Sequence, residues 1–170
     1  MMRMGKKPFP DQVGRLGEKL VEAALSRPVR GRFNRPLFRV VHLGEKYPVA
    51  DLLVSVVNSK DIPICFFLVQ IRSTEKTPSS LRRPLRVRVA QEKLRQLAKL
   101  PMPTYVVAVD TAREQLFIVS AWRSKKGGIR KVARRFDLSK DSIRIELYNE
   151  VMKFWKKAAL AKRKSRFTNG

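Results

Sequence analysis

Three polar residues whose types could do chemistry together lie at the ends of two neighbouring apolar runs. Asp51 begins the run Asp51–Asn58, and Gln70 and Arg72 lie near the end of the run Ile62–Ser73. A carboxylate and an amide oxygen are ligands that a hard cation such as Mg²⁺ accepts, and an arginine beside them can clamp a phosphate. Together these residue types point to metal-assisted chemistry on a phosphodiester.

The two runs predict the arms of one β-hairpin, closed by a two-residue turn at Lys60-Asp61. That turn pairs Asp51 directly with Gln70, and the two-residue period of a strand puts Arg72 on the same face. The rest of this face is mostly apolar, and polar groups buried there are costly unless they are paired or used. The plain alternative is an ordinary ion pair between Asp51 and Arg72 that Gln70 solvates.

The segments around these residues resemble the core of the PD-(D/E)xK nuclease superfamily. The likeness is carried by Pro48–Val54, by Phe67–Thr74 and by the pair Gly17-Glu18 on a helix ahead of the first strand. It looks closest to small families in which a strand ending in Gln-x-Lys-Ser-Thr replaces the usual acidic-x-Lys motif. In this chain the strand ends in Gln-Ile-Arg-Ser-Thr, and the resemblance covers roughly Gly14 to Asp110.

This resemblance implies a metal-dependent endonuclease site. In the superfamily the Asp, the second acidic or Gln residue and an intervening carbonyl hold the metal, which gives those places to Asp51, Gln70 and the carbonyl of Ile71, with Mg²⁺ or Mn²⁺ as cofactor. Arg72 stands where the superfamily has a lysine that positions or activates water. Because arginine stays protonated, it suits a phosphate clamp better than a base. With one carboxylate in the hairpin, Glu18 is the best candidate for an additional acidic ligand.

Charge is the second strong signal in the sequence. The 170 residues contain 38 Lys and Arg against 14 Asp and Glu, a formal net charge of +24. A charge so far from zero indicates a polyanionic partner, and nucleic acid is the commonest such surface. The last twenty residues form one basic cluster, and two others supply the candidate nucleic-acid contacts: Arg82, Arg83, Arg86, Arg88, Arg95, Lys99, Lys125, Lys126, Arg130 and Lys131.

Several other classes of site are disfavoured. Cys65 is the single cysteine, which excludes an intrachain disulfide framework and a cysteine zinc site, and His42 is the single histidine, too little for serine or cysteine hydrolase machinery. No apolar stretch is long enough for a membrane span, and the basic N-terminus is not followed by the apolar core of a secretory signal. We therefore expect a cytoplasmic protein.

The other elements must hold the hairpin in place. A first helix at Asp11–Leu25 is predicted from the apolar stripe Val13, Leu16, Leu20 and Ala24. Strands are expected at about Leu37–Leu43, Asp51–Asn58 and Ile62–Ser73. A second helix is predicted from Val87, Ala90, Leu94, Leu97 and Ala98, ending at Pro101, with Arg88, Arg95 and Lys99 on its other face. Two strands, Pro103–Asp110 and Gln115–Trp122, and a final helix at about Lys140–Ala159 follow.

This order of elements predicts an α/β fold with a restriction-endonuclease-like core. A mixed sheet would carry flanking helices in the order helix, three strands, helix, two strands and C-terminal helix. The run at Pro103–Asp110 is apolar throughout, which favours a strand buried on both faces. One domain at residues 11–159 is expected between basic tails at residues 1–10 and 160–170.

Three functions stay open at this point. The first is a metal-dependent nuclease that acts on DNA or RNA. The second is a catalytically inactive nuclease-like subunit that binds nucleic acid within a larger complex, with a protein partner or as a homodimer. The third is a structural nucleic-acid-packing or RNA-binding protein, in which the charge is the function and the hairpin cluster is only an ion pair.

Overall fold

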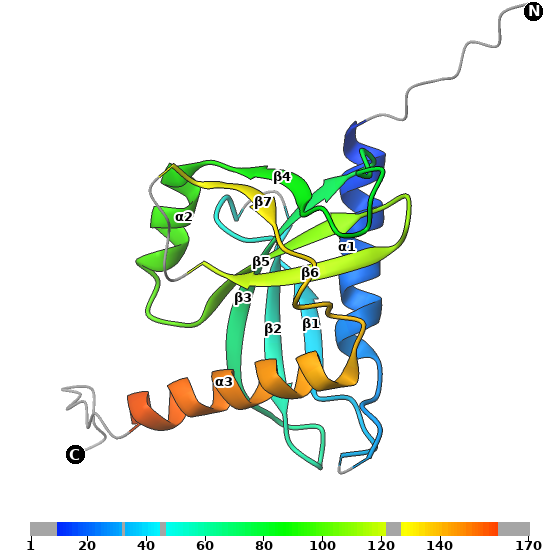
Figure 1. Ribbon diagram of the computed structural model, residues 1–170. Helices are drawn as coiled ribbons and strands as arrows, with labels where there is room; N and C mark the ends of the chain where they lie inside the picture. The colour runs from blue at the N-terminus through cyan, green and yellow to red at the C-terminus, as the bar shows by residue number, and fades with distance from the viewer. Residues whose placement is uncertain (1–9, 32, 45–46, 122–126, 160–170) are drawn as a thin grey trace, which may run out of the picture.

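A computed structural model of the chain describes residues 10–31, 33–44, 47–121 and 127–159 (Figure 1). Within these ranges the elements in chain order are α1 (Pro10–Ser26), β1 (Phe38–His42), β2 (Leu52–Val57), β3 (Pro63–Thr74), β4 (Leu85–Val89), α2 (Gln91–Ala98), β5 (Thr104–Asp110), β6 (Gln115–Ser120), β7 (Ile129–Val132) and α3 (Asp141–Ala159). The predicted α/β class is confirmed.

A mixed sheet of five strands, in the order β1-β2-β3-β5-β6, forms the centre of the fold. The pairs β1–β2, β2–β3 and β5–β6 are antiparallel, whereas β3 and β5 are parallel. A parallel pair needs a crossover connection, and β4 and α2 supply it. Every residue of β5 is buried, so the prediction of a strand covered on both faces is confirmed.

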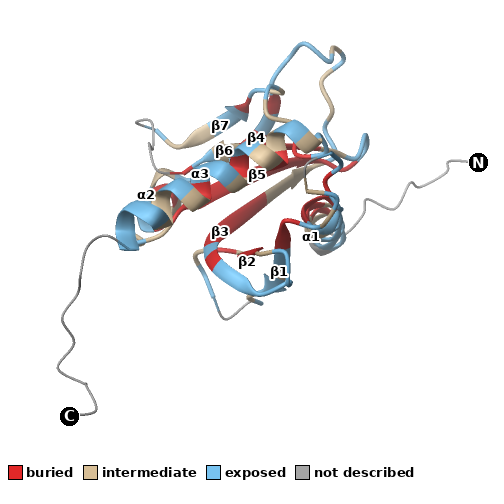
Figure 2. Ribbon diagram, turned by 90° about the horizontal axis from the view of Figure 1, so that it is seen from below, coloured by how far each residue is buried: buried red, intermediate tan, exposed pale blue. Residues whose placement is uncertain are grey.

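The two faces of the central sheet are covered by different elements. On one face, Val21 of α1 and Val151 of α3 share a core with Phe67 of β3. On the other face, Leu94 of α2 packs with Leu68 of β3, and the small sheet β4–β7 packs beside them. Figure 2 shows the buried residues concentrated in the central strands.

The buried face of α1 is turned from the predicted stripe. Leu16, which was expected to be buried, is 42 % exposed, whereas Gly17 and Val21 are buried. Gly17 explains the shift, because its missing side chain lets the helix lie directly on β3. A Cβ atom at Gly17 would be 1.8 Å from the Oγ of Ser73. This close approach also brings the neighbouring Glu18 beside the end of the sheet.

The hairpin of β2 and β3 has the predicted register but a different turn. Leu52 pairs with Val69 and Val56 with Cys65, as expected, and Asp51, one residue ahead of β2, contacts Gln70 through its side chain. The turn is longer than two residues, because the N–H of Asn58 donates to the carbonyl of Ile62 at 3.0 Å. A bulge next to this turn shifts the register by one residue. It restores the expected pairing before the strands reach their polar end.

The prediction of a helix with an apolar stripe from Val87 to Ala98 was partly wrong, because the helix begins only at Gln91. Residues 85–89 form β4, in which Leu85, Val87 and Val89 are buried and alternate with exposed arginines. Arg88 therefore lies on a strand and not on a helix face. The partner strand β7 was not predicted at all. The alternation has the two-residue period of a strand, but the spacing from Val87 to Leu94 also fits a helix, and the distant partner decides between them.

The final helix α3 begins within one residue of its predicted start and contacts the hairpin at Phe66, toward the turn and away from the polar end. The indole Nε1 of Trp155 donates to the carbonyl of Phe66 at 2.7 Å, and the two rings lie 4.8 Å apart. Of the helices in the described ranges, none combines the length and apolar character that crossing a bilayer requires. The predicted tails, and Trp122 at the end of the predicted strand Gln115–Trp122, lie outside the described residues.

Candidate functional site

Asp51 is fixed at the point where β2 begins. Its N–H donates to the carbonyl of Val69 at 2.9 Å, and its carbonyl accepts the N–H of Leu43 at 3.0 Å. Its carboxylate Oδ2 accepts the N–H of Ile71 at 2.5 Å and the side-chain amide of Gln70. The carboxylate of Asp51 thus accepts the backbone N–H of Ile71 at a point where β3 extends past the first residue of β2.

Gln70 is buried, with 1 % of its surface exposed. Its Nε2 donates to Asp51 and also to the carbonyl of Ile71 at 3.2 Å. Its Oε1 is buried and has no hydrogen-bond partner among the described residues. Leaving a buried acceptor unpaired costs about 1–3 kcal/mol, so this oxygen is a candidate ligand atom.

Arg72 follows on the same face, and its Nη1 lies 3.4 Å from the carbonyl of Ile71. Arg72 and Asp51 line one cavity of about 650 Å³. The cavity lies where α1, the start of β2, the end of β3 and β4 meet, and Glu18, Arg86 and Arg88 also line it. The predicted convergence of a carboxylate, an amide and a cation at the end of the hairpin is therefore present.

Glu18 faces this cavity, but its carboxylate interacts with His42 on β1. Its Oε2 lies 3.4 Å from Nδ1 of His42, and Oε2 of Glu22 lies 2.9 Å from Nε2 of the same ring. The hydrogen bond to Glu22 raises the pKa of His42, and Glu18 raises it to a smaller extent. Partial burial of the ring lowers the pKa but does not cancel the rise. In the described part of the chain, no three His, Cys, Asp or Glu side chains form a metal-binding group.

Lys93, in the first turn of α2, is the site residue that the sequence did not single out. Its Nζ donates to the carbonyl of Pro48, just ahead of Asp51. Burial lowers the pKa of Lys93, the charge of Arg72 lowers it further, and Asp51 opposes both effects. In the sequence Lys93 was one of many basic residues, and only the docking of α2 beside the hairpin separates it from them.

The electrostatics of this group favour an anionic ligand. Burial raises the pKa of Asp51, although the hydrogen bond from Ile71 and the charges of Arg72 and Lys93 oppose the rise. The cavity is lined by four cations against three carboxylates: Arg72, Lys76, Arg86 and Arg88 against Glu18, Asp51 and Glu75. A phosphate oxygen would be attracted to this balance of charge, since Coulomb interactions are stronger away from bulk water.

The donor atoms also fit a hard divalent cation. Asp51, Oε1 of Gln70 and the carbonyl of Ile71 are oxygen ligands of the kind that Mg²⁺ accepts while it keeps several waters. In the observed conformation the amide nitrogen of Gln70 faces Asp51. A cation between them requires the amide to turn, and the turn brings the unpaired Oε1 toward the cation. With one carboxylate, the group would hold a metal mainly together with a substrate phosphate.

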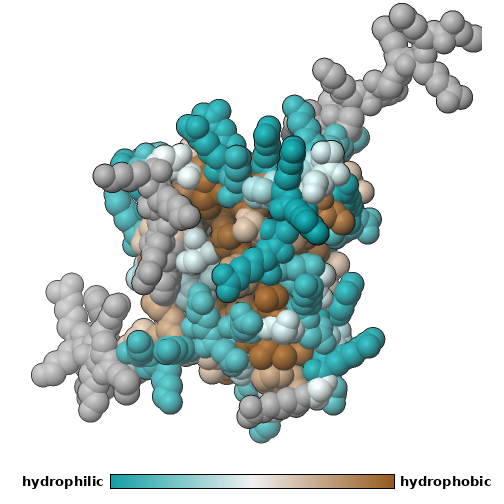
Figure 3. Space-filling model, in the orientation of Figure 1, coloured by the Kyte–Doolittle hydropathy of each residue, from teal (hydrophilic) through white to brown (hydrophobic). Residues whose placement is uncertain are grey.

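The predicted nucleic-acid contacts lie on three elements. Arg86 and Arg88 on β4 and Arg130 and Lys131 on β7 are exposed, as are Arg82 and Arg83 in the preceding loop and Arg95 and Lys99 on α2. Arg95 also lies 3.9 Å from the carboxylate of Glu92. Lys125 and Lys126 lie outside the described residues. Figure 3 shows hydrophilic side chains projecting over the region of β4 and β7.

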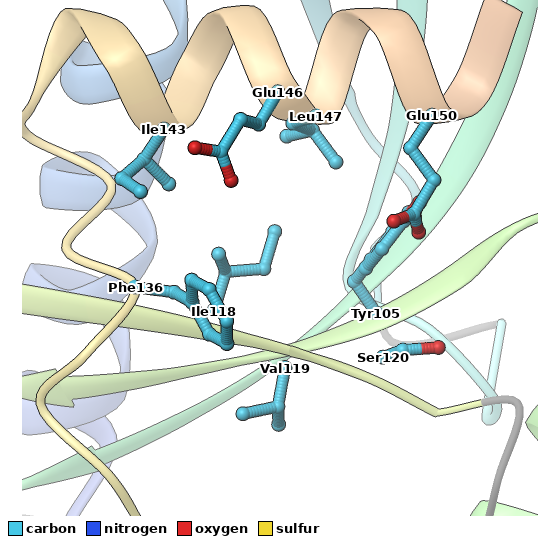
Figure 4. Close-up of a pocket in the computed structure, with 9 residues that line it drawn as sticks. All are labelled: Tyr105, Ile118, Val119, Ser120, Phe136, Ile143, Glu146, Leu147 and Glu150. Atoms are coloured by element: carbon cyan, nitrogen blue, oxygen red, sulfur yellow. The ribbon is translucent and has the colours of Figure 1, made fainter.

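A second cavity, of about 210 Å³, lies between α3 and the strands β5 and β6 (Figure 4). Most of its lining is apolar, and its acidic residues are Glu146 and Glu150. The hydroxyl of Tyr105 donates to Glu150 at 2.7 Å, and burial together with this carboxylate raises the pKa of Tyr105. Its described lining has no Lys or Arg beside these two carboxylates, whereas the first cavity has four, so a phosphate would be repelled and this cavity is not a part of the site.

Comparisons with known proteins give no match. A scan against protein-family models, a search of curated proteins and a search of solved structures each found nothing significant. The resemblance to the PD-(D/E)xK superfamily stays a prediction, and the function has to be inferred from the geometry of the site.

Proposed function

We propose that this chain is a nucleic-acid-binding protein of the PD-(D/E)xK type that hydrolyses phosphodiester bonds with Mg²⁺ or Mn²⁺. The observation that carries the proposal is the contact between Asp51 and Gln70 at the end of the hairpin, with a buried Oε1 left unpaired. Arg72 lines the same cavity, and Lys93 is close enough to perturb the pKa of Asp51. The restriction-endonuclease-like form of the α/β fold is part of this proposal.

The residues would divide the work by their chemistry. Asp51, Gln70 and the carbonyl of Ile71 would hold the metal, which supplies charge neutralisation and an acidified water when bound. Arg72 would bind the scissile phosphate, because its planar guanidinium can donate two parallel hydrogen bonds to two phosphate oxygens. These three groups come from adjacent positions on two paired strands, so the sheet fixes their spacing.

Lys93 can give up a proton, which Arg72 cannot. An arginine does not give up its proton, whereas a lysine with a lowered pKa has a larger neutral fraction. Burial and the charge of Arg72 lower the pKa of Lys93. Its Nζ, which donates to the carbonyl of Pro48 three residues ahead of Asp51, could orient the attacking water or exchange a proton with it.

A second candidate function has support from the same atoms. In the observed conformation Asp51 already accepts two hydrogen bonds from β3, so it has a structural role without any metal. In this alternative the cleft and the basic surface bind nucleic acid without cutting it, as a nuclease-like subunit of a larger complex. If the charge alone is the function, neither Asp51 nor Arg72 would matter more than any other charged residue.

The test is cleavage of labelled single- and double-stranded DNA and RNA with Mg²⁺ or Mn²⁺. Asp51→Asn should lower the rate by at least about 100-fold, beyond the loss typical of an outer-shell change, because it removes the only carboxylate of the group. Its affinity for nucleic acid should stay equal or rise slightly, since a negative charge is lost from a basic cleft.

Glu146→Gln is the matched control, because it makes the same change of charge on α3, across the sheet from the site. This variant should cleave at the wild-type rate. Wild-type chain that cleaves no substrate with either metal would favour the binding subunit. Equal effects of the two substitutions would rule out a special site at Asp51.

A further inference from the structure

The two-stranded sheet of β4 and β7 presents one apolar and one cationic surface. Leu85 pairs with Val132, and Arg86 pairs with Lys131 in the next position. Directly paired residues of an antiparallel ladder share a face, so the first pair points inward and the second outward. The two buried residues and the two exposed ones agree with this division.

A bulge extends the cationic surface. The register shifts between Arg86 and Val89, so Val87 and Arg88 together lie opposite the single residue Arg130. Val87 is buried, and both arginines are exposed. The ribbon therefore exposes four cationic side chains, of which the first three line one hollow: Arg86, Arg88, Arg130 and Lys131.

The ribbon is held firmly on its inner side. Leu85, Val87 and Val132 form a core with Ala108 and Phe117 of the central sheet. An element packed in this way keeps its outward side chains in a fixed arrangement. It covers the face of the central sheet opposite α3, because it packs on Ala108 and Phe117, whereas α3 shares a core with Val107 and Ile118.

Three hollows meet along the ribbon and connect it to the proposed site. Arg86 lines all of them. The first contains Asp51 and Arg72, and the second, of about 530 Å³, is lined by Arg83 and Lys131 among others. The third, of about 500 Å³, is lined by side chains of the ribbon alone, and neither of the last two has a described acidic residue in its lining. Cations thus continue from the site across the ribbon.

We infer that the β4–β7 ribbon enters the major groove of a B-form duplex and that the substrate of the proposed site is double-stranded DNA. This inference rests on the proposed function. The major groove is about 12 Å wide and admits a two-stranded β-ribbon. The two strands of a ribbon lie about 4.8 Å apart, which leaves room for side chains to reach the phosphates on either side.

The same surface is a poor match for other nucleic acids. The major groove of A-form RNA is too narrow and deep for protein side chains to read. Single strands are bound on aromatic platforms, and the outward surface of the ribbon consists of cationic side chains. Phe33, an aromatic residue in a basic segment, packs edge-on against Tyr148 with ring centres 5.3 Å apart, so it is not free to stack on a base.

The test compares binding of the full chain to labelled duplex DNA, single-stranded DNA and duplex RNA of equal length, by fluorescence anisotropy without divalent metal. We expect duplex DNA to bind at least about 10-fold more tightly than the other two, within the range that separates specific from non-specific complexes. Equal affinity for single-stranded DNA or duplex RNA would overturn the inference.

A triple variant, Arg86→Ala, Arg88→Ala and Lys131→Ala, tests the surface itself. It should lose most of the preference for duplex DNA and flatten the salt dependence by about 0.9 in log–log slope for each phosphate contact removed. The control is the triple variant Lys153→Ala, Lys156→Ala and Lys157→Ala, which removes equal charge from exposed positions on α3.

The control should weaken binding to all three nucleic acids alike and keep the preference. A ribbon variant that binds no differently from this control would contradict the assigned surface. Because metal is absent from these measurements, their outcome does not depend on cleavage, and a failure of the hydrolytic proposal shows separately. Thermal unfolding of both variants checks that the fold is kept, which is expected because the inward residues are unchanged.

Discussion

At the scale of single residues, some features of the site at the end of the hairpin could be predicted from the sequence and others could not. The convergence of Asp51, Gln70 and Arg72 follows from strand period and register, which are local and visible in the sequence. The unpaired Oε1 of Gln70 is not visible in the sequence pattern, and the approach of Lys93 depends on how α2 docks on the sheet. That docking is a long-range packing event, so the sequence pattern did not show it.

Arg72 offers the sharpest test of what the cation does. If it clamps the scissile phosphate, Arg72→Ala should lower cleavage by about 10²- to 10³-fold, the usual effect of removing one transition-state donor. Arg72→Lys should keep the activity or raise it, because lysine stands at this place in the PD-(D/E)xK superfamily that the sequence resembles. Steady-state cleavage rates of both variants give the comparison.

The variant Lys93→Met distinguishes the role of Lys93 from that of Arg72. It removes the charge and keeps the length of the side chain. If Lys93 acts on the attacking water, this variant should lower kcat while KM for the nucleic acid stays nearly constant. A variant that changes only KM would assign Lys93 to binding.

His42 makes the stability of the fold depend on pH. Its folded pKa is raised above 6.5 by Glu22 and Glu18, so its protonated form is favoured in the folded state. The stabilisation is complete below about pH 6.5 and is lost as the pH rises through the folded pKa. For a half-exposed pair we expect less than about 1 kcal/mol.

The measurement is the Tm of the wild type and of His42→Gln at pH 6 and at pH 9. The wild type should exceed the variant at the lower pH, and the gap should close at the higher pH. A gap that is the same at both values would show that the two glutamates do not act through the charge of His42.

At the scale of elements, the packing of α1 on β3 places Glu18 at the cavity. Gly17 makes this close packing possible, because it has no side chain between α1 and β3. Gly17→Ala would force a Cβ against Ser73, and such overpacking costs about 1–3 kcal/mol. Gly14→Ala is the matched control, since a Cβ there meets nothing within 4 Å. Because alanine favours a helix by up to about 1 kcal/mol over glycine, this control should gain stability.

Urea unfolding of both alanine variants gives the difference. Adding Ser73→Ala to Gly17→Ala should recover part of the loss, because it removes the nearest atom. Equal stability of the two single variants would show that α1 does not approach β3 as closely as the structure has it.

The elements that the sequence did not predict are the two strands of the ribbon. The alternation in Leu85–Val89 was visible, but a short alternating run next to a helical stripe fits both periods. Its partner Ile129–Val132 is forty residues away and only four residues long. Pairing across such a distance depends on the central sheet that both strands cover, so it appears only when the whole fold is formed.

At the scale of the whole molecule, charge and architecture agree. The net charge of +24 predicted a polyanionic partner, and the structure exposes a cationic ribbon that opens onto the hairpin site. The α/β class and the mixed sheet were predictable, because apolar runs and helical stripes indicate the fold class and the order of the elements.

The net charge of the chain also affects how it binds a metal ion. A strongly cationic chain whose proposed metal ligands include one carboxylate, Asp51, repels a divalent cation until nucleic acid supplies negative charge.

Uptake of Mn²⁺ by the full chain, followed through the EPR signal of the free ion with and without a short DNA duplex, tests the central claim most directly. We predict weak uptake by the chain alone and, with the duplex present, one additional Mn²⁺ per chain beyond what the DNA itself binds. Asp51→Asn should lose this ion, and Glu146→Gln should keep it. Retention of the ion by Asp51→Asn, or no uptake by the wild type beyond that of the DNA, would contradict a metal site at Asp51 and Gln70.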